Sequence, residues 1–87
     1  MQMSDEARSI LVFAAYHELL AGDPVKEVVL DDGAGHKASA NGQQELADAG
    51  LITINGDRAH ITEDGEQVLA SLLNAIRSAT GDYEAKR

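Results

Sequence analysis

The sequence predicts a small α+β domain that is mainly helical and carries one β-hairpin. Two long stretches, one near each end of the chain, have apolar residues at steps of three and four, the spacing of one helix face. Between them, "LITINGDRAHIT" places β-favouring residues on both sides of Asn55-Gly56, the dipeptide that best suits a tight hairpin turn. Because 87 residues leave room for only one core, we expect a single domain over 1–80 and a frayed tail over 81–87.

The first helix is expected to begin at Ser4 or Asp5, both favourable N-cap residues, and to run to about Ala21. Gly22 then ends it. Its apolar stripe consists of Ile10, Leu11, Ala14, Ala15 and Leu19. One face of this helix is therefore predicted to lie on the core.

The next segment, Val25–Leu30, has two interpretations. Asp23 followed by Pro24 is a favourable helix start, and the valines would share one face of a short second helix. The same residues are β-branched enough for a strand, which "DDGAG" would turn back. We favour the short helix, because the segment that follows is expected to need a helix in front of it. The predicted order is then helix-helix-helix-strand-strand-helix.

A third helix is predicted from Ser39 to Ala49, ended by Gly50. Leu46 is its core anchor. Gly42 weakens it by about 1 kcal/mol relative to alanine.

The hairpin that follows has two candidate registers. A two-residue turn sets Ile52 opposite Ala59, whereas a three-residue turn sets Leu51 opposite Ile61. Thr62 then caps the last helix. Its apolar stripe consists of Val68, Leu69, Leu72, Leu73 and Ile76.

The chain is acidic, with 15 Asp and Glu against 7 Lys and Arg and a formal net charge of -8. This charge repels nucleic-acid phosphates and anionic membranes at long range. The first residues lack the basic region of a signal peptide, and no apolar run approaches the roughly 20 residues that span a bilayer. We therefore expect a cytoplasmic protein that does not enter the membrane.

No cofactor, metal site or catalytic site is expected. The chain has no cysteine, and His17, His36 and His60 fall on three separate segments. The "DDGAGHKAS" loop lacks the Gly-Lys-Ser/Thr order of a phosphate-binding loop. No Ser-His-Asp spacing occurs, and adjacent acids such as Asp31-Asp32 point in different directions. We expect the protein not to be an enzyme.

Three parts of the second half of the chain stand out: Leu46, the "AGLI" of Ala49–Ile52 and the "ITEDGEQVL" of Ile61–Leu69. Together they resemble the third helix, first wing strand and final helix of the winged helix-turn-helix family. The resemblance covers about Ser39 to Ala79, and the chain is similar to small proteins of bacterial and phage genomes.

The resemblance implies that the third helix enters the DNA major groove while the hairpin tip contacts the backbone or the minor groove. Asn and Gln can bond adenine, and Lys or Arg can bond guanine or phosphate. The DNA-binding residues implied in this way are Lys37, Asn41, Gln43 and Gln44, with Arg58 on the wing.

The resemblance also favours a homodimer, because winged-helix proteins often pair through their terminal helices. The apolar stripe of the last helix has two interpretations: all of it lies in the core, or it is wider than one small core needs and the surplus packs against a second copy. The interface expected there, together with the first helix, consists of Leu69, Leu72, Leu73 and Ile76.

Acids lie next to the residues implied to read DNA: Glu45, Asp48 and Asp57. We therefore expect a non-enzymatic winged-helix module that contacts a protein partner with a basic surface, in the manner of a phage-type inhibitor of nucleic-acid machinery. The alternative is a dimeric transcriptional regulator that reads DNA with the helix 39–49 and the wing 52–61.

Overall fold

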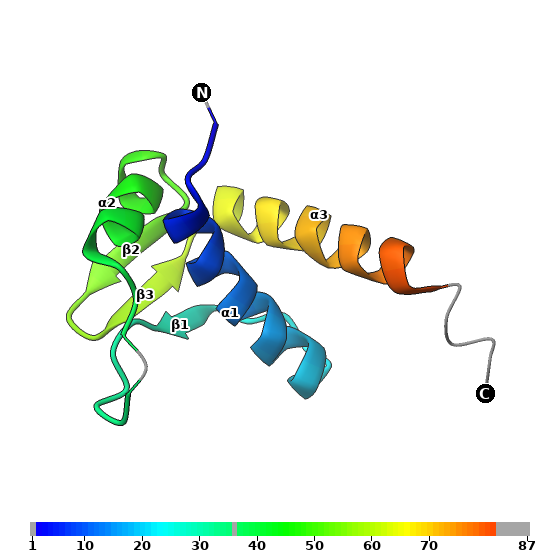
Figure 1. Cartoon of the computed structure of the whole chain (residues 1–87), viewed down its shortest axis with the longest axis horizontal. Helices are drawn as coiled ribbons and strands as arrows, with labels where there is room; N and C mark the ends of the chain where they lie inside the picture. Colours follow the sequence, from blue (N-terminus) through cyan, green and yellow to red (C-terminus); the bar gives the residue numbers. More distant parts are fainter. Residues whose placement is uncertain (1, 36, 82–87) are drawn as a thin grey trace.

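The computed structural model describes residues 2–35 and 37–81 of the chain. The described part contains three helices and one antiparallel sheet with the strand order β1-β3-β2 (Figure 1). This confirms the expected α+β class. In chain order the elements are α1 (Asp5–Ala21), β1 (Glu27–Val29), α2 (Ala40–Asp48), β2 (Ile52–Asn55), β3 (Arg58–Ile61) and α3 (Glu63–Thr80). The tail expected to fray, from residue 82 onward, lies outside the described residues.

The segment expected to form a second helix is a strand, so that expectation is wrong. Within β1, Val28 lies opposite Ala59 of β3, and the strand continues the hairpin into a third strand. Val28 and Leu30, two positions apart, are both buried, as the period of a strand requires. The helix signal of Asp23-Pro24 is local, whereas the free edge of β3 offers a short β-branched segment hydrogen-bond partners. The observed order, helix-strand-helix-strand-strand-helix, differs from the order that the winged-helix resemblance implies.

The hairpin has a register that neither sequence-based alternative predicted. Ile52 lies opposite Ile61, and the two turn residues are Gly56 and Asp57. Gly56 has a φ of 64°, while no described non-glycine residue has a positive φ. A glycine with positive φ at the first turn position is the pattern of a type II′ turn. Asn55 therefore extends β2 instead of entering the turn.

The core lies between α1, the sheet and the first half of α3, and α2 contributes the fully buried Leu46 to it. Leu69 and Leu73 of α3 are only 2% and 1% exposed, so these two residues of the expected dimer interface belong to the core of their own chain. Leu72 and Ile76 pack against that core and are partly buried. Beyond them α3 runs away from the rest of the fold (Figure 1).

Two helical glycines allow backbones to approach closely. A Cβ on Gly42 would lie 2.7 Å from the carbonyl oxygen of Glu6, and a Cβ on Gly65 would overlap the carbonyl oxygen of Leu51. Gly42 therefore brings α2 against the first turn of α1, and Gly65 brings α3 against the start of β2. From the sequence, Gly42 was only a cost in helix propensity.

Candidate functional site

A groove of about 560 Å³ lies between the N-terminal segment and the outer side of α2. Met3 and Ala49 supply apolar lining, and carboxylates and carboxamides supply the polar lining. The residues that line the groove are Gln2, Met3, Asn41, Gln44, Glu45, Leu46, Asp48 and Ala49. Gln2 and Met3 could not be predicted as site residues from the sequence, because nothing local connects the start of the chain with α2.

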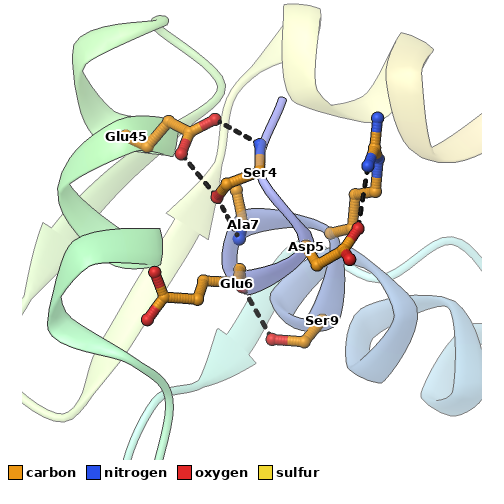
Figure 2. Close-up of polar contacts among 7 residues, drawn as sticks. Ser4, Asp5, Glu6, Ala7, Ser9 and Glu45 are labelled. Atoms are coloured by element: carbon orange, nitrogen blue, oxygen red, sulfur yellow. Dashed lines mark hydrogen bonds and ion pairs between the residues drawn. The ribbon is translucent and has the colours of Figure 1, made fainter. Parts of the chain in front are cut away.

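Two serine–glutamate contacts hold α1 and α2 together and fix one wall of the groove. The Ser4 hydroxyl caps α1 by accepting from Ala7 N at 3.1 Å and donates to Glu45 Oε1 on α2 at 2.6 Å (Figure 2). The backbone N–H of Ser4 donates to Glu45 Oε2 at 2.8 Å (Figure 2). Both carboxylate oxygens of Glu45 are therefore bound to the residue that begins α1.

The second contact leads from the N-cap of α2 to a glutamate of α1. The Ser39 hydroxyl caps α2 by accepting from Gly42 N at 3.3 Å and donates to Glu6 Oε2 on α1 at 2.6 Å. Each N-cap hydroxyl thus accepts from its own helix and donates to a glutamate of the other helix. This exchange places α2 beside the N-terminal segment that forms the groove.

Glu45 carries a negative charge into the lining of the groove. Hydrogen bonds from the Ser4 hydroxyl and backbone N–H lower the pKa of the Glu45 carboxyl below its ordinary value of 4.5, and the positive charge of Arg8 lowers it further. At neutral pH the carboxylate is therefore ionised, and it is held in one orientation.

The remaining polar groups of the groove carry no positive charge. Gln44 Nε2 donates to Asp48 Oδ1 at 2.8 Å across one helical turn, and Asn41 is exposed at the start of the same face. None of the described residues that line the groove is Lys, Arg or His. The outer face of α2 is thus a surface of amides and carboxylates.

The five residues implied to bind DNA do not form one surface. Asn41 and Gln44 lie together in the groove, whereas the Gln43 Nε2 donates to the Ala38 carbonyl at 3.1 Å. Arg58 forms an ion pair with Glu27 at 3.3 Å on the sheet. Lys37 is exposed in a different recess, beside α1.

That recess, of about 260 Å³, lies between α1 and the segment before α2. Ser9, Phe13 and Tyr16 of α1 are among the residues that line it, and Lys37–Ser39 form its other side. The recess adjoins an exposed apolar surface of α1 that was not predicted from the sequence.

That surface is the side of α1 opposite the core, here called the outer face of α1. Val12, Tyr16, Leu19 and Leu20 are 51%, 55%, 44% and 70% exposed. Leu19 was expected to belong to the core stripe, so that assignment is wrong. The signal in the sequence was a second apolar stripe, at steps of four and three from Val12, on the back of the first.

Across residues 2–35 and 37–81, no three His, Asp or Glu side chains gather as they would around a metal ion. Among the three histidines, His17 and His60 lie on α1 and β3, and His36 is outside the described residues. In the same part of the chain no helix combines the length and apolar character needed to cross a bilayer.

Comparison of the chain with family models, with curated proteins and with solved structures finds no match.

Proposed function

We propose that this protein is a non-enzymatic binding module whose groove beside α2 receives basic side chains of a partner protein. The observation that carries the proposal is the composition of the groove: its charged groups are the carboxylates of Glu45 and Asp48, and apolar surface from Met3 and Ala49 lies beside them.

This combination suits the side chains of lysine and arginine. Their aliphatic stems pack along apolar surface while the charged ends stay at the polar rim. Here the stem would lie along Met3 and Ala49, and the charged end would donate to Asp48. Hydrogen bonds between two charged groups are about twice as strong as neutral ones, and arginine can make two at once.

The charge of the whole chain favours the same kind of partner. A net charge of -8 attracts a basic surface from a distance and raises the rate of productive encounter. The same charge disfavours other acidic partners, so it contributes to selectivity as well as to speed.

The alternative function, reading of DNA, has less support. The face of α2 that would enter the major groove presents Glu45 and Asp48, which repel phosphates. Arg58 already pairs with Glu27, and Lys37 lies in the recess beside α1.

The test uses a fluorescently labelled peptide of alternating arginine and alanine, with binding measured by anisotropy at low ionic strength. We expect Asp48→Asn to weaken binding about tenfold, because a hydrogen bond to a charged group contributes roughly 1.5 kcal/mol. Asp57→Asn at the exposed hairpin tip is the matched control, because it removes the same charge at a distance from the groove. It should change the affinity less than twofold.

Equal losses in the two variants would show that the peptide responds only to net charge, and the groove would then not be the site. Absence of peptide binding to the unaltered protein would also overturn the proposal. Binding of a DNA duplex at low salt that Lys37→Glu abolishes would support the alternative instead.

A further inference from the structure

We propose that the outer face of α1 is covered by a second copy of this chain. The two α1 helices would pack antiparallel, with a two-fold axis near Tyr16. This interface is separate from the groove beside α2, and it replaces the one expected on α3, where Leu69 and Leu73 are core residues.

α1 carries apolar residues on two opposite sides. The inner side supplies five buried residues to the core, while Val12, Tyr16, Leu19 and Leu20 are exposed on the other. An exposed apolar face that the core does not cover commonly marks an interaction surface. Steps of four and three from Val12 through Tyr16 to Leu19 are those of a seam that packs against another helix.

The outer face of α1 carries a projecting side chain and lies next to a recess. Leu20, the most exposed of the four, lies four residues after Tyr16, and Val12 lies four residues before it. A two-fold axis at Tyr16 therefore sets Leu20 of one copy opposite Val12 of the other. There the recess of about 260 Å³ begins, between Phe13 and Ala38, with room for the leucine. Symmetry repeats the contact, as in an isologous dimer.

The small number of charged side chains on the outer face of α1 favours a second copy over a basic partner. From Arg8 to Ala21 the one acidic residue is Glu18, whose carboxylate accepts from Val25 N at 3.3 Å. Between Val12 and Leu20 the face has no exposed carboxylate, so two chains of net charge -8 approach there with little repulsion and a basic partner finds no acidic group to bind. The same axis brings Arg8 of one copy, which pairs with Asp5 of its own chain at 2.8 Å, toward Asp23 of the other, since the two lie eight residues before and seven after Tyr16.

Sedimentation equilibrium of the full chain, from micromolar to millimolar concentration, tests the proposal. We expect the unaltered protein to approach twice its chain mass of 9.2 kDa. Leu20→Glu should raise the dissociation constant of the dimer at least about tenfold, because symmetry places the change twice in each interface. Ala75→Glu, which adds the same charge at an exposed position of α3, is the control and should leave the dimer nearly unchanged.

A charge pair tests the antiparallel geometry itself. Val12→Lys alone and Leu20→Glu alone should each weaken the dimer. The double variant Val12→Lys/Leu20→Glu should regain much of the association, because the axis sets the new ammonium group of one copy opposite the new carboxylate of the other. Circular dichroism of each variant confirms that it is folded, which the exposure of both positions favours.

A monomeric mass for the unaltered protein at every concentration would overturn the proposal. So would a dimer that persists in Leu20→Glu, which would locate the interface elsewhere. Failure of the double variant to regain association would exclude the antiparallel arrangement. Peptide binding at the groove is a separate readout, so either proposal can fail without the other.

Discussion

α1 and α2 are adjacent helices joined by side-chain hydrogen bonds, yet the outer face of one is apolar and that of the other is polar and acidic. α2 presents carboxamides and carboxylates around a groove, whereas α1 presents aliphatic and aromatic side chains with no exposed acid between Val12 and Leu20. Formal net charge describes neither face, because it averages them. The difference is the basis of the two proposals for this small domain: an electrostatic contact with a basic protein and an apolar contact between copies.

The largest expected effect comes from a substitution in the core, which destabilises the fold that carries both outer faces. Leu73→Ala should destabilise the fold by about 2–5 kcal/mol, because Leu73 is fully buried and its loss leaves a cavity. Chemical denaturation measures this free energy of unfolding. Were Leu73 mainly an interface residue, the variant would lose dimer mass with little loss of stability in the monomer.

Gly42→Ala is expected to loosen the contact between α1 and α2 without emptying the core. Its new Cβ would meet the Glu6 carbonyl, and such overpacking typically costs 1–3 kcal/mol, about 1 kcal/mol of which is regained through helix propensity. Gly81→Ala, where a Cβ meets nothing within 4 Å, is the control. Equal stability of the two variants would contradict the close approach of the helices.

Salt separates the two faces directly. Raising the NaCl concentration should weaken the binding of the basic peptide several-fold, because mobile ions screen exposed charges. Self-association should stay constant or strengthen, since the same ions reduce repulsion between the acidic chains. Anisotropy and sedimentation of one sample series give both curves, and parallel weakening would contradict the apolar character of the interface on α1.

The smallest expected effect is a pH dependence of stability that arises at the contact between Glu45 of α2 and Ser4 at the start of α1. The Glu45 pKa is lowered in the folded protein, so the carboxylate adds stability above its ordinary pKa of 4.5. That stability is lost as the pH falls through the lower folded pKa. Glu45→Gln should therefore be less stable than the unaltered protein at pH 7, and the gap should close in acid. A gap that widens on acidification would reverse the assigned sign.

The sequence predicted what is local. Helix starts were expected at Ser4 or Asp5, at Ser39 and at Thr62, and Ser4, Ser39 and Thr62 all cap helices with hydroxyls that accept from the backbone. This works because an N-cap needs only a suitable side chain and the three residues after it.

The sequence did not predict what depends on distant partners. β1 becomes a strand because β3, some 30 residues later, offers it an edge, and no window around Val28 contains that information. The groove residue Met3 and the second face of α1 were missed for a similar reason. A periodic stripe shows that a helix has an apolar face, but Tyr16 and Leu20 became informative only once the core was seen to be complete without them.

The two serine–glutamate contacts have a dynamic consequence. Opening of the first turn of α1 moves Glu6, the acceptor that the Ser39 hydroxyl uses at the start of α2. Glu45, which accepts from Ser4, lies in the second half of α2 and stays in place when the first turn of α2 opens. Fraying of α1 should therefore loosen the start of α2, whereas fraying of α2 leaves the Ser4 contact intact. Amide protons in the first turn of α2 should then exchange with solvent at least as fast as those in the first turn of α1.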